Sequence, residues 1–189
     1  MNKQVITIGR QCGSGGHAIG ERLAQRLGIP FYDKDALETM TLRENAPEPS
    51  CTSLLFNLAT GIYDGYLLTK PTEGDATAGL AQLIRDLADR GPCVIVGRCA
   101  DHILQDRADC LRVFVYGSME DRVRRMADRE HLTEDEARRQ IENKDFLRAR
   151  HYRLVTGQTW GQEENYDLTL NTSALDPDQC VEGILSACE

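Results

Sequence analysis

Four glycines within eight residues form the segment of this sequence best suited to chemistry. Residues 9–16 read Gly-Arg-Gln-Cys-Gly-Ser-Gly-Gly and follow the β-branched run at 5–8. Glycines let a backbone approach an anion without side-chain clashes, and successive amides in such a turn form an anion-binding hollow. A helix that starts after the turn adds its positive N-terminal dipole. The segment therefore predicts a phosphate-binding loop, and its contacts would be Gly13, Ser14, Gly15 and Gly16.

The loop departs from the standard signature G-x-x-x-x-G-K-[ST] at its charged and hydroxyl positions. With Gly15 as the second glycine, Arg10 stands at the first glycine, Gly16 at the lysine and His17 at the hydroxyl. Arg10 and His17 are candidate replacements for the lysine, and Ser14 is a candidate metal ligand. A glycine-rich turn is also an ordinary connection between a strand and a helix, so phosphate binding depends on the rest of the chain.

Arginines at three places suit phosphoryl transfer, because that reaction is catalysed mainly by positioning and by cations around the phosphate oxygens. Arg98 directly follows an apolar strand, while Arg148 and Arg150 lie towards the end of a long predicted helix, where a lid could carry them. We interpret four other helix arginines as exposed surface charges whose ion pairs contribute little to stability. These are Arg124, Arg125, Arg138 and Arg139.

Two aspartates at predicted strand ends are candidate acceptor-binding residues. Asp33 could hold Mg²⁺ through water or orient an acceptor hydroxyl, and Asp101 could bind the sugar or base of an acceptor. Either residue could equally be a helix N-cap, a common role for aspartate after a strand.

Apolar strands alternate with helices along the chain, which predicts an α/β fold with a parallel sheet between two helical layers. Ligands on such sheets bind at the carboxyl ends of the strands. The glycine loop, Asp33 and residues 97–101 all fall at such ends. The expected strands are 5–8, 29–33, 93–96, 111–116 and 166–170, and the expected helices are 17–27, 34–44, 51–66, 76–90, 99–106, 117–129, 133–152 and 177–187, with turns at 45–50 and 70–75.

Length and composition indicate one soluble domain, 1–189. The 189 residues are 41% hydrophobic and 28% charged, which is typical of a globular protein with its own core. A net charge of −8 argues against nucleic acid as a partner, since nonspecific binding needs a basic face. No apolar run approaches the length of a membrane span, and no signal-peptide pattern is present, so we expect a cytoplasmic protein that binds no membrane.

Seven cysteines, an odd number, show no C-x-x-C spacing. This excludes the usual zinc pattern and makes a disulfide framework improbable, so most of the thiols are expected to be small buried residues. Cys12 in the loop and Cys99 after Gly97-Arg98 are the two thiols that we expect to be exposed.

Taken together, these segments resemble the cytidylate kinase-like family of the P-loop nucleoside monophosphate kinases, over nearly the whole chain. The resemblance rests on 6–8 with 13–16, 31–34, 94–101, 148–152 and 166–173. It implies a three-layer α/β/α kinase fold with a helical insert at about 34–90 and a lid at about 130–162. It also implies phosphorylation of a nucleotide such as CMP by ATP with Mg²⁺. Monophosphate binding would fall to Arg98 and catalytic contacts to Arg122, Arg148 and Arg150.

The chain also departs from that family. Authentic cytidylate kinases keep the loop lysine and a following hydroxyl, and they carry an aspartate where this chain has Cys99. Loss of one preorganised donor to a transition-state oxygen costs about 3–4 kcal/mol, or roughly 10²–10³ in rate, unless another group replaces it.

Three functions fit the sequence. The first is an ATP-dependent phosphotransferase acting on a nucleotide or another small acceptor bearing a phosphate or hydroxyl. The second is a nucleotide-binding sensor that has kept the fold and lost the chemistry. The third is an anion-binding or redox-responsive protein that uses Cys12, whose thiol would be activated by the helix N-terminus. The oligomeric state is left open by the sequence, and an oligomer is possible.

Overall fold

The computed structural model describes residues 3–44 and 75–189. Its centre is a parallel sheet with the strand order β2-β3-β1-β4-β5. Because β1 lies between β3 and β4, the chain reverses its direction of winding beside β1, which is where α/β sheets form their ligand crevice. The strands are β1 (Val5–Arg10), β2 (Phe31–Tyr32), β3 (Cys93–Val96), β4 (Cys110–Tyr116) and β5 (Leu168–Asn171).

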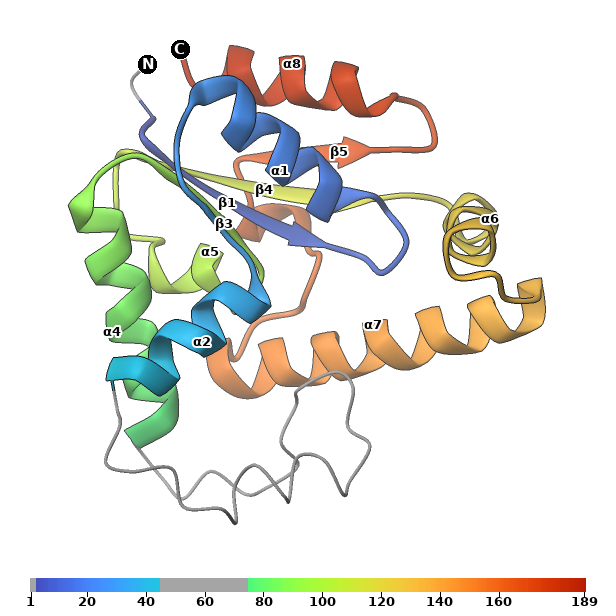
Figure 1. Ribbon diagram of the computed structural model, residues 1–189, viewed down its shortest axis with the longest axis horizontal. Coiled ribbons are helices and arrows are strands. Elements are labelled where there is room, and N and C mark those ends of the chain that lie inside the picture. Colours follow the sequence, from blue (N-terminus) through green and yellow to red (C-terminus); the bar gives the residue numbers. More distant parts are fainter. Residues whose placement is uncertain (1–2, 45–74) are drawn as a thin grey trace.

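Helices cover both faces of this sheet (Figure 1), with α1 and α8 on one face and α4 and α5 on the other. The predicted α/β class with a parallel sheet is confirmed. The helices are α1 (Gly16–Leu27), α2 (Lys34–Glu44), α4 (Asp75–Arg90), α5 (Ala100–Ile103), α6 (Met119–Glu130), α7 (Glu134–Thr156) and α8 (Pro177–Ala187), with a 3-10 turn at Glu163–Asn165.

Successive side chains along each strand point to opposite faces of the sheet and pack into two separate hydrophobic clusters. Ile6 and Ile8 pack with α1 and α8, whereas Val5 packs with α4 and α5 on the opposite face. In the same way Val94 faces the first layer and Ile95 the second. This two-residue period explains why strands buried on both sides read as continuous apolar runs.

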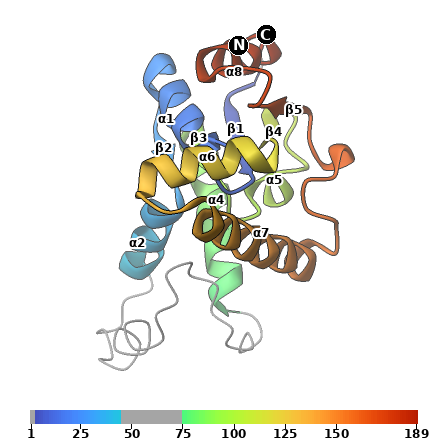
Figure 2. The same ribbon diagram turned by 90° about the vertical axis from the view of Figure 1, so that its right-hand side faces the viewer.

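A third apolar cluster joins α6 and α7 to the glycine loop, and Figure 2 shows these two helices in front of the sheet, with α6 lying across the view and α7 below it. Cys12 of the loop packs there with Val123 of α6 and Ile141 of α7. The long helix starts at the predicted capping box, in which Thr133 and Glu136 each accept a hydrogen bond from the other's backbone N–H. The cluster thus fixes the N-terminal part of α7 beside the loop.

Several element boundaries differ from the prediction. β1 continues to Arg10, so the arginine leaves from the end of a strand, and α7 continues to Thr156, four residues past the expected end. β2 is only two residues long, and β5 is Leu168–Asn171, two residues later than expected at its start. The expected helix at 51–66, the turn at 45–50 and all but the last residue of the turn at 70–75 lie outside the described residues, and that last residue, Asp75, starts α4.

Within the described ranges, no helix combines the length and apolarity that crossing a bilayer requires.

Candidate functional site

The glycine loop between β1 and α1 has the geometry of an anion-binding hollow. Gly13 and Gly15 take positive φ angles of 76° and 83°, while Ser14 between them does not. Alternation of this kind turns successive N–H groups towards one side of the loop. In the described part of the chain, the amides of Gly13, Gly15 and Gly16 donate to no protein acceptor. The loop therefore presents free donors at the start of α1.

Charged side chains hold the outer side of the loop in place. Asp145 of α7 accepts a hydrogen bond from the Cys12 N–H at 2.7 Å and another from Arg122 Nη1 at 2.5 Å. Arg122 also donates to the Cys12 carbonyl at 3.1 Å, and its residue is 5% exposed. The interpretation of Arg125 as a surface charge is wrong, because its guanidinium is half-buried and donates to the Gly13 carbonyl at 3.3 Å.

The hydroxyl of Ser14 is turned into the loop itself. Its Oγ donates to the Gln11 carbonyl at 2.8 Å, and the residue is 1% exposed. Nearby, the His17 imidazole packs edge-on against Phe31 and lies 4.0 Å from Asp33 Oδ2. The other carboxylate oxygen of Asp33 accepts from the Ala36 N–H at 2.9 Å and so caps α2. One oxygen of Asp33 thus remains beside the first turn of α1.

The backbone is strained at the three residues that follow β3, which include Arg98. Gly97, Arg98 and Cys99 all have positive φ, at 81°, 58° and 54°. Two successive non-glycine residues in this region cost of order 1–3 kcal/mol each and occur mostly at functional sites. Arg98 pairs with Glu38 of α2, and its buried Nε has no hydrogen-bond partner in the described chain. Burial lowers the pKa of the Arg98 guanidinium, as expected where cationic charge is desolvated.

The C-terminal half of α7 completes the site. Arg148 Nη1 donates to the Arg10 carbonyl at 3.2 Å, and the Tyr152 hydroxyl donates to Asp101 Oδ2 at 2.7 Å. Asp101 is 5% exposed, and its burial raises its pKa although the Tyr152 hydrogen bond acts in the opposite direction. Burial, with help from Arg98, lowers the pKa of His151. Asp101 is therefore a residue within α5 that is bonded to α7, and not the N-cap of α5, which is Cys99.

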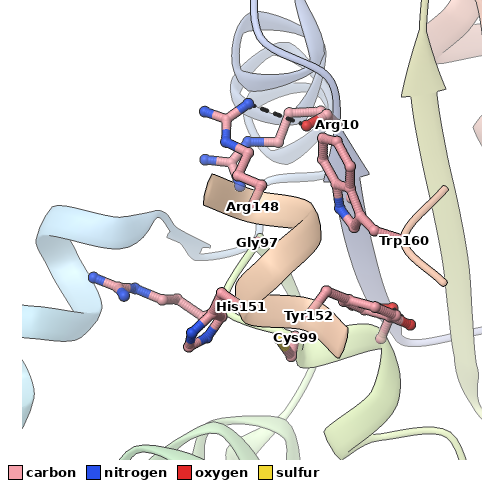
Figure 3. Close-up of a pocket in the computed structure, with 10 residues that line it drawn as sticks. Arg10, Gly97, Cys99, Arg148, His151, Tyr152 and Trp160 are labelled. Carbon is pink, nitrogen blue, oxygen red and sulfur yellow. Dashed lines mark hydrogen bonds between the residues drawn. The ribbon is translucent and has the colours of Figure 1, made fainter. Parts of the chain in front are cut away.

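These groups line one cavity of about 30 Å³ at the carboxyl ends of β1 and β3. Figure 3 shows the side chains of Arg10 and Arg148 next to each other, with Trp160 beside Arg10 and with His151 and Tyr152 below them. The complete lining is Gly9, Arg10, Gly97, Arg98, Cys99, Asp101, Arg148, His151, Tyr152 and Trp160. The structure thus brings together Arg10, Arg98, Asp101 and Arg148 from four separate elements.

Other predicted site residues lie outside this cavity. Arg150 is exposed on α7, and Arg122 lies behind the glycine loop with its charge paired to Asp145. The expected exposure of two thiols is wrong, since Cys12 and Cys99 are each 6% exposed. Burial also raises the pKa of the Cys99 thiol to about 12. A buried, protonated thiol is a poor nucleophile.

Asp145 and His151 were not recognised from the sequence as site residues. The spacing of residues along α7 could have indicated Asp145. Ala137 and Ile141 of this helix are buried and face α6. Continuing that stripe at intervals of four, three and four residues reaches Asp145, Arg148 and Tyr152. A buried helix face that changes from apolar to polar marks the point at which the helix leaves the core and meets the site.

Comparison with known proteins relates the chain to a kinase family. The model of the cytidylate kinase-like family matches residues 5–174. The cytidylate kinase of Methanopyrus kandleri is 26% identical over 183 residues, and the match covers 93% of this chain and 88% of the relative.

Two solved structures share the fold. An uncharacterized protein from Eubacterium ventriosum superposes with a TM-score of 0.79 at 24% identity, covering 98% of both chains. A gluconokinase from Sinorhizobium meliloti gives a TM-score of 0.57 at 21% identity, covering 97% of this chain and 90% of its own. These likenesses confirm the predicted P-loop kinase fold, with helices on both faces of the parallel sheet.

Proposed function

Because the chain belongs to the cytidylate kinase-like family, we propose that it transfers the γ-phosphoryl group of ATP to a small acceptor, with nucleoside monophosphates such as CMP as the first candidates. The proposal rests on two structural features that lie together at one edge of the sheet. The glycine loop offers free amides, and beside it Arg10, Arg98 and Arg148 line one cavity. Positioned cations and amides are what phosphoryl transfer requires.

On the donor side, the amides of Gly13, Gly15 and Gly16 would hold the ATP phosphates. The residues present also fit Mg²⁺, which is usually held by one or two carboxylates together with substrate phosphates. Asp33 would supply the carboxylate, because its Oδ2 lies 4.0 Å from His17 in the first turn of α1. Ser14 does not fit this role, since its hydroxyl donates within the loop. When bound, Mg²⁺ would neutralise charge on the phosphate oxygens.

On the acceptor side, Arg98 and Arg148 would hold an anionic group of the acceptor, and Asp101 would contact a hydroxyl or base. A cavity of about 30 Å³ holds only one or two waters, so an acceptor must displace part of the wall. The wall formed by Arg148, His151 and Tyr152 belongs to α7. We therefore assign α7 and the loop after it to the lid at about 130–162, and α2 with α4 to the acceptor insert at about 34–90. Arg150, which lies outside the cavity, would reach substrate only after such a movement.

The phosphoryl group would pass directly from ATP to the acceptor, so the reaction requires no protein nucleophile. A lone pair of the acceptor oxygen forms the new bond to the γ-phosphorus, while the bond to the bridging oxygen breaks and its electron pair leaves on ADP. A monophosphate acceptor attacks with an oxygen that is already deprotonated. The arginines remain protonated throughout and stabilise charge on the transferred group. Arg122, buried behind the loop, contributes by holding the Cys12 carbonyl in place.

An assay of ADP release with ATP and Mg²⁺ tests the proposal across all nucleoside monophosphates and a set of small hydroxyl acids. We expect turnover with at least one acceptor, and a loss of about 10²–10³ in kcat for Arg98→Ala. Arg26→Ala is the matched control, since that arginine pairs with Glu182 on the surface. Absence of turnover with every acceptor would refute a phosphotransferase.

One observation favours a second function, a nucleotide-binding sensor. The lysine and hydroxyl positions are held by Gly16 and His17, and the hydroxyl of Ser14 is bonded to the Gln11 carbonyl. A loop that binds phosphate with amides alone retains affinity without full catalysis. Calorimetry with ATP, CMP and CTP separates the two functions, because a sensor binds its nucleotide tightly and does not turn it over.

A further inference from the structure

On the basis of the phosphotransfer proposed above, we propose that Arg10 is the catalytic cation of the glycine loop. Its side chain occupies the place of the lysine that the standard loop carries six residues later, and Gly16 is a glycine because Arg10 fills the space in front of it. The loop departs from the standard signature at position 10, where arginine replaces glycine, and at position 16, where glycine replaces lysine. We interpret these two departures as one exchange, in which the charged residue and the glycine have changed places.

Steric packing at Gly16 supports the coupling. A Cβ atom placed on Gly16 would lie 2.6 Å from the Cβ of Arg10 and 3.2 Å from both its Cγ and the Cβ of Val115. Carbon atoms attract one another best at about 3.5–4.0 Å, so the first of these contacts is prohibitive. Side chains at positions 10 and 16 therefore exclude each other. The standard loop solves this with glycine at the first position and lysine at the second, and this chain uses the reverse arrangement.

A second glycine leaves room for the other end of the Arg10 side chain. A Cβ atom on Gly97 would overlap Nη1 of Arg10, and Gly97 has a φ of 81°, which glycine alone adopts without strain. The arginine thus runs from the end of β1, past Gly16, to the backbone at the end of β3. Its guanidinium reaches the cavity that Arg98 and Arg148 also line, and Arg148 donates to the Arg10 carbonyl (Figure 3).

This position lies between the two halves of the proposed reaction. The Arg10 backbone leads directly into the loop that would hold the donor phosphates, and the guanidinium faces the cavity that would hold the acceptor. Of the other two arginines at this cavity, Arg98 pairs with Glu38, and Arg148 Nη1 lies 3.8 Å from Asp145 Oδ1. Arginine, with its planar fork of donors, binds two phosphate oxygens at once, whereas lysine acts as a point charge. Arg10 neither accepts nor releases a proton during the transfer described above.

The test combines phosphate binding with a double-mutant cycle on the full chain. Inorganic tripolyphosphate serves as the probe in calorimetry, so binding is measured whether or not an acceptor is known. We expect Arg10→Ala to weaken tripolyphosphate binding about tenfold and to lower kcat, where turnover is measurable, by about 10²–10³. Arg10→Gln is the second variant, which keeps a polar side chain with Cβ, Cγ and Cδ but removes the guanidinium charge, and Arg26→Ala on the outer side of α1 is the control.

The double-mutant cycle introduces Gly16→Lys into the unmodified chain and into the Arg10→Gly variant. With Arg10 present, the added side chain overpacks the site and should lower Tm by about 5 °C. With Arg10→Gly, the same lysine should leave Tm unchanged and restore tripolyphosphate affinity towards that of the unmodified chain. Unchanged probe binding in both Arg10 variants, or the same effect of Gly16→Lys in both backgrounds, would overturn the assignment. If the unmodified chain binds the probe but phosphorylates no acceptor, phosphotransfer fails as the function, while the cycle still decides the role of Arg10.

Discussion

The carboxylate of Asp145, on α7, accepts a 2.7 Å hydrogen bond from the backbone N–H of Cys12, in the glycine loop. The second carboxylate oxygen binds Arg122 of α6, so a single acidic side chain connects the proposed lid, a neighbouring helix and the glycine loop. An outward movement of α7 must either break this bond or carry the loop with it. Loop geometry and lid position are therefore coupled through one residue.

Asp145→Ala should destabilise the fold strongly, because it leaves the buried guanidinium of Arg122 without its counter-ion. Removal of one partner of a buried ion pair costs about 3–5 kcal/mol. Urea denaturation measures the loss, and Glu142→Ala, an exposed residue on the same helix, should change stability by less than about 0.5 kcal/mol. Equal stability of the two variants would mean that the bond to Cys12 and the ion pair contribute nothing.

Gly13→Ala should cost more than Gly28→Ala, although both glycines have positive φ. Each substitution places alanine in a left-handed conformation, at a cost of about 1–2 kcal/mol. A Cβ on Gly13 would also lie 2.8 Å from the Arg122 carbonyl oxygen, whereas nothing lies within 4 Å at Gly28. We expect the difference in unfolding free energy to exceed about 1 kcal/mol. Only Gly13→Ala should also weaken the binding of tripolyphosphate.

Tyr152→Phe should make stability depend more steeply on pH. Burial raises the pKa of Asp101, and the Tyr152 hydrogen bond opposes that rise. Between the ordinary value of 3.8 and the raised value, the native state holds the proton that the unfolded chain releases. The contribution of this carboxyl to stability is complete below that window and falls as pH rises through it.

Loss of the Tyr152 donor should raise the pKa of Asp101 further and so widen the pH interval over which stability falls. The variant should therefore lose about 1–3 kcal/mol of unfolding free energy at about pH 8 and less at about pH 5. Denaturation curves at both pH values measure the difference. Tyr116→Phe, an exposed tyrosine on β4, is the control. A loss that is independent of pH would show that Asp101 is not the group affected.

Asp167→Asn should destabilise the protein at neutral pH and much less in acid. Arg112 donates to Asp167 from Nη2 at 2.6 Å, from Nε at 3.1 Å and from its backbone at 2.8 Å. The side-chain hydrogen bond from Arg112 lowers the pKa of Asp167. Stability from this pair is therefore present above the ordinary carboxyl pKa and is lost as pH falls through the lowered value.

We expect a loss of about 1 kcal/mol at neutral pH for Asp167→Asn, since the pair is partly exposed and screened by solvent. The effect should disappear in strong acid. Asp106→Asn, an exposed aspartate, should have no measurable effect at either pH. Thermal unfolding, followed from neutral pH into strong acid, would contradict the prediction if the two variants were equally stable at neutral pH.

Alkylation should be slow at the two thiols nearest the site. Cys12 and Cys99 are each 6% exposed, and burial raises the pKa of Cys99 to about 12. Site-resolved mass spectrometry after iodoacetamide treatment should find both at least about tenfold less reactive than a free thiol. Reaction at Cys12 faster than at a free thiol would instead favour the anion-binding, redox-responsive function.

The sequence by itself determined the elements whose signals are local. Buried parallel strands read as short apolar runs, the capping box at Thr133 starts α7, and glycines at 13 and 15 permit the positive φ of an anion-binding turn. Arg98 at a strand end was identified in the same way, because parallel strands bring their carboxyl ends to one edge. Each of these signals is contained within a few neighbouring residues.

Only the tertiary structure decided how the charged side chains are used. Arg122 and Arg150 look alike in the sequence, yet one is buried behind the loop and the other is exposed on α7. Asp145 bonds to a residue 133 positions away. Arg10 reaches the cavity because two glycines distant from each other, Gly16 and Gly97, leave space along its path. Contacts such as these depend on which segments the sheet brings together, and no local pattern of residue types encodes them.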